Sequence, residues 1–145
     1  MCIRDRGYVG LVTGACFAGS GNSVVCVDID EEKIESLRRA EVPFFEPGLD
    51  EMVRNNIDEG RLSFTTDIAL AIRESLLIFI AVGTPQAQNG EADISSVLDV
   101  ARSIGRNLDG YKIVITKSTV PVGTCLLYTS PSPRDRTRSR MPSSA

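Results

Sequence analysis

The chain has no histidine. Histidine is the commonest general base and a frequent metal ligand, so acid–base chemistry would have to come from carboxylates, lysine or bound water. The four cysteines stand at positions 2, 16, 26 and 125, which is neither the paired spacing of a metal site nor the density of a disulfide framework. We therefore expect no metal and a reducing, cytoplasmic environment.

Long apolar runs are also missing. No stretch approaches the roughly 20 residues that cross a bilayer, and no secretory signal is visible, so we expect no membrane partner. The hydrophobic content of 42% and a mean hydropathy near zero are typical of a soluble globular protein. A length of 145 residues is enough for one domain with a core.

The two ends of the chain differ from its middle. Residues 1–6 equal the translation of ATGTGTATAAGAGACAG, the end of a transposon sequencing adapter, and residues 125–135 resemble the translation of its reverse complement, TGTCTCTTATACACATCT. We therefore expect residues 1–6 and 125–145 to be non-native, the second as a disordered tail, and residues 7–124 to be the natural segment. The alternative for the C-terminal part is a genuine disordered tail, because Ser, Pro and Arg are typical of one.

Charge follows the same division. Residues 7–124 contain ten basic and seventeen acidic residues, a net charge of −7, whereas arginines gather in the C-terminal tail. A nucleic-acid-binding arm would depend on those tail arginines alone. Since we interpret them as non-native, we expect no nucleic-acid partner.

Hydrophobic periodicity predicts alternating elements in residues 7–124. Apolar runs predict strands and 3.6-residue spacing predicts helices, with Asp30 as a helix N-cap. Alternating strands and helices indicate an α/β fold, a Rossmann-type doubly wound parallel sheet. The predicted helices are 11–18, 31–39, 49–59, 67–74 and 95–108, and the predicted strands are 23–27, 62–65, 76–82 and 112–116.

A glycine turn and a strand-end acid indicate a dinucleotide site. Gly7, Tyr8, Val9 and Gly10 precede a small-residue helix, and Asp28 ends the next strand 18 residues after Gly10, close to the usual spacing of about 20. Such glycines let backbone N–H groups approach a pyrophosphate, and the acid binds a ribose hydroxyl. A carboxylate there favours NAD over NADP, whose 2′-phosphate it repels. The alternative for Asp28 is an ordinary solvated strand end.

The start of this motif is defective. The first motif glycine would be residue 5, where the chain has Asp5, and residues 1–6 are short and charged, unlike a buried parallel strand. We therefore expect the first strand to be missing or replaced. Because that strand lies in the middle of such a sheet, we also expect the chain to fold poorly.

Two further segments follow predicted strands. Residues 81–85 and 117–120 should meet the glycine turn at the carboxyl edge of the sheet, where ligands bind. Their alternatives are a plain strand exit and an ordinary helix cap. Three other residues have open assignments. Glu46, in a proline-rich loop, is either loop surface or a wall of the site, and Lys33 either points to solvent or lies against the adenosine. Cys16 and Cys26 are expected to be small core residues.

Six segments together resemble the N-terminal domain of the UDP-glucose 6-dehydrogenases, in the UDP-glucose/GDP-mannose dehydrogenase family. The likeness covers essentially all of residues 7–124. It lies in Gly-Tyr-Val-Gly-Leu (7–11), Val-Asp-Ile-Asp (27–30), Phe-Glu-Pro-Gly-Leu (45–49), Gly-Arg-Leu-Ser-Phe-Thr-Thr-Asp (60–67), Ile-Ala-Val-Gly-Thr-Pro (80–85) and Lys-Ser-Thr-Val-Pro-Val-Gly-Thr (117–124).

This resemblance implies an NAD-dependent enzyme that oxidises UDP-glucose twice to UDP-glucuronate, through a thiohemiacetal and a thioester on a cysteine. It implies that Thr119 helps hold a catalytic water. The family's catalytic cysteine, dimerisation helix and UDP-binding domain lie beyond Thr124, so the chain alone is expected to be inactive and its parent a homodimer. The implied cofactor-binding residues are Gly7, Tyr8, Val9 and Gly10 at the pyrophosphate, Asp28 and Lys33 at the adenosine, Val82, Gly83, Thr84 and Pro85 along the cleft, and Ser118, Thr119 and Val120 near the nicotinamide.

Two alternatives remain open. The fragment could come from a GDP-mannose or UDP-N-acetylmannosamine dehydrogenase, although residues 117–124 resemble the UDP-glucose enzymes more. It could also be an NAD-binding module that carries out no chemistry.

Overall fold

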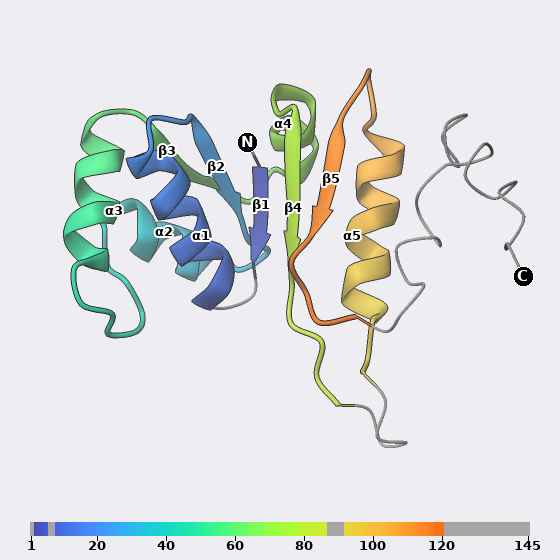
Figure 1. Ribbon diagram of the computed structural model, residues 1–145, viewed down its shortest axis with the longest axis horizontal. Coiled ribbons are helices and arrows are strands. Elements are labelled where there is room, and N and C mark those ends of the chain that lie inside the picture. The colour runs from blue at the N-terminus through green and yellow to red at the C-terminus, as the bar shows by residue number, and fades with distance from the viewer. Residues whose placement is uncertain (1, 6–7, 87–91, 121–145) are drawn as a thin grey trace, which may run out of the picture.

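The structure, a computed structural model, describes residues 2–5, 8–86 and 92–120. Gly7 and residues 125–145 therefore lie outside the described residues. The described part forms one sheet of parallel strands in the order β3-β2-β1-β4-β5, with helices on both faces (Figure 1). The strands are β1 (Cys2–Asp5), β2 (Val24–Val27), β3 (Leu62–Thr65), β4 (Leu77–Ala81) and β5 (Ile113–Thr116), and the helices are α1 (Tyr8–Gly19), α2 (Glu31–Arg38), α3 (Leu49–Asp58), α4 (Ile68–Glu74) and α5 (Ser95–Arg106).

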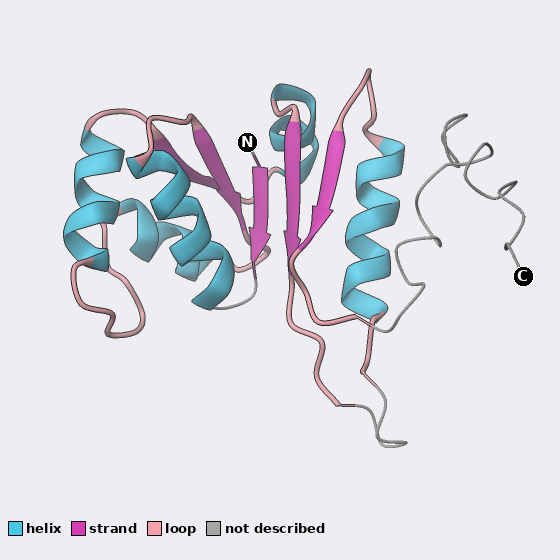
Figure 2. Ribbon diagram, viewed as in Figure 1, coloured by secondary structure: helices cyan, strands magenta, loops and turns pink. Residues whose placement is uncertain are grey.

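Side-chain alternation along the strands separates two apolar layers. In β4, Phe79 and Ala81 pack in the layer beneath α1, α2 and α3, whereas Ile78 and Ile80 pack in the layer beneath α4 and α5. Figure 2 shows these helices on the two sides of the sheet. Strands buried on both faces need apolar residues at nearly every position, which is why β4 reads as a continuous apolar run.

A first strand is present, so of the two expected alternatives, a missing or a replaced strand, the missing one is wrong. Residues Cys2–Asp5 form β1 in the centre of the sheet, in parallel register with β2 (Ile3 opposite Cys26) and with β4 (Ile3 opposite Phe79). A strand is held by backbone hydrogen bonds, and two neighbouring strands supply these on either side whatever the side chains. The reason we gave for poor folding, a gap in mid-sheet, is therefore wrong.

Helix starts follow local capping chemistry. The Asp30 carboxylate accepts a hydrogen bond from the Lys33 amide (3.1 Å), which confirms Asp30 as the N-cap of α2, and the Asp67 carboxylate accepts one from the Leu70 amide (2.9 Å) at α4. Each bond satisfies an amide that has no partner within its helix. Helix α1 begins at Tyr8, earlier than the predicted residue 11, so that Gly10 lies inside its first turn.

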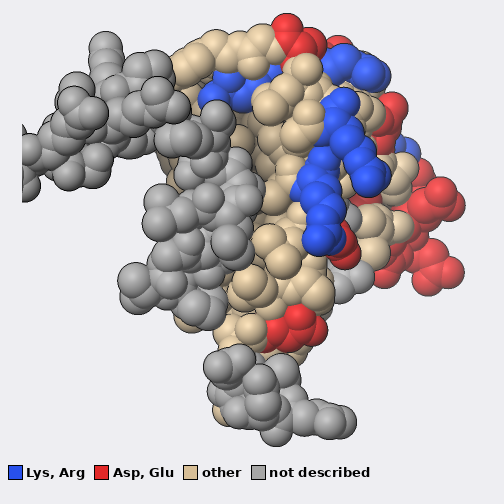
Figure 3. All heavy atoms as spheres, turned by 90° about the vertical axis from the view of Figure 1, so that its right-hand side faces the viewer, with Lys and Arg blue, Asp and Glu red and all other residues tan. Residues whose placement is uncertain are grey.

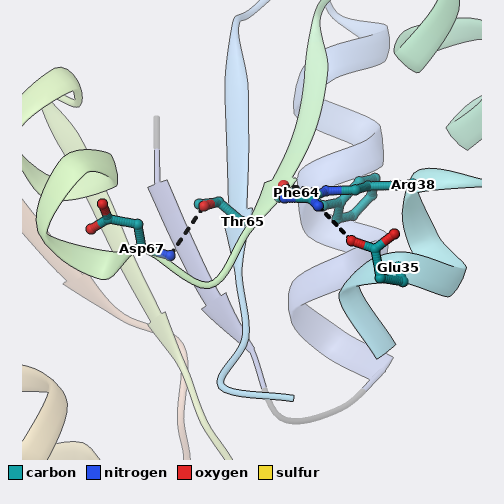
Figure 4. A network of polar contacts seen from close by, with 5 residues as sticks. All are labelled: Glu35, Arg38, Phe64, Thr65 and Asp67. Carbon is teal, nitrogen blue, oxygen red and sulfur yellow. Dashed lines mark hydrogen bonds and ion pairs between the residues drawn. The ribbon is translucent and has the colours of Figure 1, made fainter. Parts of the chain in front are cut away.

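Helix α2 is fastened to the carboxyl end of β3. The Arg38 guanidinium donates from Nε and Nη2 to the Phe64 carbonyl (3.1 Å each) and from Nη1 to Glu35 (2.6 Å). Next along the chain, the Thr65 hydroxyl accepts a hydrogen bond from the Asp67 amide (3.0 Å), as Figure 4 shows. These bonds hold α2, and the residues at its start, at the edge where strands β2 and β3 end.

Helix α3 and its flanking loops run along α1. At the far end of α1, Arg61 Nε donates to the Ala18 carbonyl and to Asn56 Oδ1 (both 3.0 Å). At the entry to α3, Gly48 has φ +80°, a left-handed conformation that favours glycine. The segment from Val42 to Arg61 contacts α1 at both of its ends, through Arg61 at Ala18 and through Phe44 and Glu46 at Tyr8.

Two smaller expectations have opposite outcomes. Cys26 is buried in the core as expected, but Cys16 is exposed on α1, so its assignment to the core is wrong. The small residues around Cys16 obscured which face of α1 meets the sheet: Leu11, Ala15 and Ala18 do. Within the described residues, no helix has the length and apolar character that crossing a membrane requires.

Candidate functional site: a cofactor edge

The carboxyl ends of the parallel strands form one edge of the domain. Helix α1 starts there after β1, Asp28 follows β2, residues 82–85 follow β4 and residues 117–120 follow β5. Because β1 lies between β2 and β4, and β5 lies beside β4, these segments stand next to one another. The predicted convergence of the glycine turn, residues 81–85 and residues 117–120 is therefore what the topology gives, except at Gly7, which lies outside the described residues.

Asp28 is a nearly buried carboxylate with both oxygens engaged. It is 5% exposed, its Oδ1 accepts the Asp30 amide (3.2 Å), and its Oδ2 pairs with Lys33 Nζ (2.6 Å). A buried carboxylate of this kind is stable only when paired and hydrogen-bonded. Lys33 thus points toward Asp28, and the alternative for Asp28, a solvated strand end, is not what is observed.

A hollow of about 290 Å³ opens beside this ion pair. Its lining residues are Asp28, Ile29, Asp30 and Lys33. Ile29 is 56% exposed, and it was missed by the sequence argument. Its position directly after a strand-end acid was the available signal. An exposed apolar side chain beside carboxylate oxygens suits a flat ring joined to a sugar.

The start of α1 presents donors at the same edge. The first helical amides, those of Tyr8, Val9 and Gly10, have no partner within a helix, and the helix dipole makes this end positive. The Tyr8 and Val9 side chains are 47% and 46% exposed, whereas Gly10 is buried. The arrangement suits an anion such as a pyrophosphate.

Residues after β4 and β5 are joined by hydrogen bonds. The Lys117 and Ser118 amides donate to the Ile80 carbonyl (2.8 and 3.2 Å), and the Ser118 hydroxyl donates to the Val82 carbonyl (2.6 Å). The Val82 side chain is buried in the layer beneath α4 and α5, so this residue can offer a ligand little more than its backbone.

The remaining predicted residues of these two segments differ in exposure. Gly83, Pro85 and Thr119 are exposed, and Thr84 and Val120 are half-buried. Val120 packs against the layer beneath α4 and α5.

Glu46 lies at the start of α1 rather than on a remote loop surface. The Tyr8 hydroxyl donates to Glu46 Oε2 (2.8 Å), and the Tyr8 ring packs against Phe44 with ring centroids 4.9 Å apart. The hydrogen bond to Glu46, with a smaller effect of burial, raises the pKa of the Tyr8 phenol. Of the two alternatives for Glu46, the structure supports a place at the edge of the site.

In the described part of the chain, no group of histidine, cysteine, aspartate and glutamate side chains is arranged to hold a metal ion. The chemistry that this edge offers consists of hydrogen-bond donors for phosphate, acceptors for hydroxyls and an open apolar surface. That set suits a dinucleotide.

Comparisons with known proteins agree with this geometry. Residues 1–141 match the UDP-glucose/GDP-mannose dehydrogenase family, NAD binding domain. The chain belongs to this family. The cofactor of this domain is accordingly NAD, as the Asp28 argument predicted.

Individual relatives give the same result. The UDP-glucose 6-dehydrogenase TuaD of Bacillus subtilis is 56% identical over 130 residues, which are 90% of this chain and 28% of that protein. The UDP-glucose 6-dehydrogenase of Rhizobium meliloti is 56% identical over 119 residues, 81% of this chain and 27% of that protein. The chain therefore spans little more than a quarter of the length of these members of the family.

Solved structures of family members share the fold. A UDP-glucose dehydrogenase from Pyrobaculum islandicum superposes with a TM-score of 0.81 at 39% identity, over 85% of this chain and 29% of that one. A GDP-mannose dehydrogenase from Pseudomonas aeruginosa, solved as a ternary complex, gives 0.83 at 36% identity, over 88% and 30%. The Rossmann-type fold is thereby confirmed.

Proposed function

We propose that this chain is the cofactor-binding part of an NAD-dependent UDP-glucose 6-dehydrogenase, whose whole protein oxidises UDP-glucose to UDP-glucuronate with two NAD⁺. The observation that carries the proposal is the nearly buried Asp28, at the end of β2 and beside an open apolar residue, on the edge where α1 begins. The two relatives at 56% identity named above, both UDP-glucose 6-dehydrogenases, support the choice of sugar nucleotide.

The proposed cofactor lies along the strand ends. The pyrophosphate faces the amides of Tyr8, Val9 and Gly10, with Gly7 before them. Asp28 accepts from the adenosine ribose hydroxyls, Lys33 lies on the adenine side, and Ile29 offers the ring an apolar surface. Val82, Gly83, Thr84 and Pro85 then line the cleft through backbone and small side chains.

Ser118, Thr119 and Val120 complete the proposal at the nicotinamide end, with Thr119 holding a catalytic water. NAD⁺ supplies a hydride acceptor, and this chain's residues bind and orient it. The cysteine that would carry the sugar is proposed to lie outside the chain, so that the chain alone does not turn over substrate. The exposure of Thr119 agrees with a role toward groups that other parts of the protein bring.

Calorimetry on the 145-residue chain tests the cofactor assignment. We expect NAD⁺ to bind and NADP⁺ to bind at least about tenfold more weakly, because Asp28 repels a 2′-phosphate. Equal affinities would contradict the proposed role of Asp28, and absence of NAD⁺ binding would contradict the cofactor site itself.

The full-length parent gene tests the substrate. Its product should reduce NAD⁺ with UDP-glucose and leave GDP-mannose and UDP-N-acetylmannosamine largely unused. Preference for GDP-mannose would favour the second candidate, which the GDP-mannose dehydrogenase superposition supports. Binding of NAD⁺ without turnover of any sugar nucleotide would favour a module that only binds the cofactor.

Further proposals concern the location, assembly and partners of the whole protein. Cys16 and Cys26 are free thiols, in keeping with a cytoplasmic protein, and we propose a homodimer that takes a UDP-sugar. Figure 3 shows lysine and arginine side chains in a stripe on the side of α5, with acidic side chains gathered in separate groups. This local stripe sits on an acidic body, so we do not propose a nucleic-acid partner.

A further inference from the structure

The proline-rich loop before α3 makes two contacts with the first residue of α1. Tyr8 Oη donates to Glu46 Oε2 (2.8 Å), and the Tyr8 and Phe44 rings pack with centroids 4.9 Å apart at an interplanar angle of 60°. Tyr8 is half-exposed, so neither contact is needed to fill the core. Both contacts lie at the start of α1, on the proposed cofactor edge, so they can affect cofactor binding.

The loop that carries Phe44 and Glu46 is itself held in place. Pro43 and Pro47 restrict its backbone, Phe44 also packs on the apolar layer beneath α1, and the Glu46 carbonyl accepts from the Leu49 amide (3.1 Å) as α3 begins. Figure 1 shows the loop and the start of α1 at the same end of the molecule. Glu46 is therefore held in a position where it accepts the hydrogen bond from the Tyr8 hydroxyl.

Glu46 also places a negative charge at the end of the domain that would receive two phosphates. Carboxylate and pyrophosphate repel each other, and an unpaired carboxylate there would oppose binding. The Tyr8 hydroxyl donates to this carboxylate and keeps it against the phenol. A phenol with the ordinary tyrosine pKa of about 10 is protonated at neutral pH, and the hydrogen bond to Glu46 raises this pKa further.

We propose that Tyr8 and Glu46 act together as positioning residues for the cofactor's pyrophosphate: the Tyr8 hydroxyl binds the Glu46 carboxylate and holds its charge away from the phosphates. This inference rests on the proposed function. It concerns two residues that contact each other and that act at the cofactor's phosphates, not at its nicotinamide. Glu46 is the new member of the site.

Four chains separate the effect of the Tyr8–Glu46 hydrogen bond from that of the Glu46 charge: wild type, Tyr8→Phe, Glu46→Gln and the double variant. Tyr8→Phe removes the donor and leaves the charge free, so NAD⁺ and ADP-ribose should bind about fivefold more weakly. The defect should shrink as salt is raised, because salt screens exposed charges. Glu46→Gln retains an acceptor without the charge and should stay within about twofold of wild type. The double variant should recover most of the Tyr8→Phe loss.

Adenosine, which has no phosphate, is the matched ligand. Its affinity, followed by NMR titration, should be the same in all four chains. A contact that serves folding alone would instead lower the melting temperature and leave the ratio of ADP-ribose to adenosine affinity unchanged, which overturns the inference. So does a double variant as weak as Tyr8→Phe.

The outcomes also separate this inference from the proposed function. If wild type binds NAD⁺ and Tyr8→Phe binds it equally well at low salt, only the positioning role fails. If wild type binds neither NAD⁺ nor ADP-ribose, the cofactor site and the positioning role fail together.

Discussion

The Asp28 carboxylate is held in place by two neighbouring groups. Its charge is balanced by Lys33, and its orientation is fixed by the Asp30 amide. Carboxylate oxygens have more than one lone pair each, so ribose hydroxyls can be added without breaking these bonds.

Replacing Asp28 with Asn should weaken NAD⁺ binding about 10- to 100-fold, the cost of a lost hydrogen bond to a charged group of about 1.5–3 kcal/mol. The same change should narrow the gap between NAD⁺ and NADP⁺. Calorimetry with both cofactors measures the effect, and Asp58→Asn, on the exposed end of α3, is the charge-matched control. An Asp28→Asn chain with wild-type preference for NAD⁺ would contradict the ribose assignment.

Tyr8 makes a prediction for pH. Because the hydrogen bond to Glu46 raises the pKa of the phenol, its stabilising effect is fully present below the usual tyrosine pKa of about 10 and disappears as pH rises through the folded-state value. The difference in melting temperature between wild type and Tyr8→Phe should therefore be constant from about pH 6 to pH 9 and vanish at higher pH. A difference that persists at pH 12 would count against this bond.

At the scale of elements, two glycines illustrate opposite demands of the backbone. Gly48 has φ +80° at the entry to α3, whereas Gly105 lies within α5, and a Cβ at either would meet nothing within 4 Å. A methyl group therefore fits at both sites, and the backbone conformation decides whether alanine raises or lowers the free energy of unfolding.

Gly48→Ala should lower the free energy of unfolding by about 1 kcal/mol, because alanine is strained in the left-handed region. Gly105→Ala should raise it by about 0.5–1 kcal/mol, because alanine favours a helix more than glycine does. Urea denaturation of both variants provides the comparison. Equal shifts of the same sign would show that the two backbones do not differ as described.

The sequence predicted most elements to within a few residues because periodicity and caps are local signals. Strand Leu62–Thr65 and the cap at Asp30 are examples. Strand β1 was missed because its place depends on partners distant in the chain, at Val25 and Ile78, rather than on its own residues. In the candidate site, spacing singled out Asp28 as a candidate, whereas its pairing with Lys33 and the contact of Glu46 with Tyr8 required tertiary structure.

At the scale of the molecule, the two halves of the sheet are joined by the short strand β1. Strand β1 pairs with β2 on one side and β4 on the other, so losing it would separate the β3-β2 half of the sheet from the β4-β5 half.

Ile3→Pro should therefore abolish cooperative thermal unfolding followed by circular dichroism, because proline removes a backbone donor within a central strand. The conservative change Ile3→Val should keep a single transition near that of wild type. A Pro variant that melts like wild type would show that residues 2–5 are not needed in the sheet.

The attachment of α1 at both ends carries a consequence for motion. Tyr8 is bound to the loop that leads into α3, and the Ala18 carbonyl is bound to Arg61 just after α3. Opening one helix must then disturb the other, so amide protons in α1 and α3 should exchange with deuterium as one cooperative unit. Occupancy of the cofactor edge should also slow exchange in α3, a helix that supplies none of the proposed cofactor-binding residues.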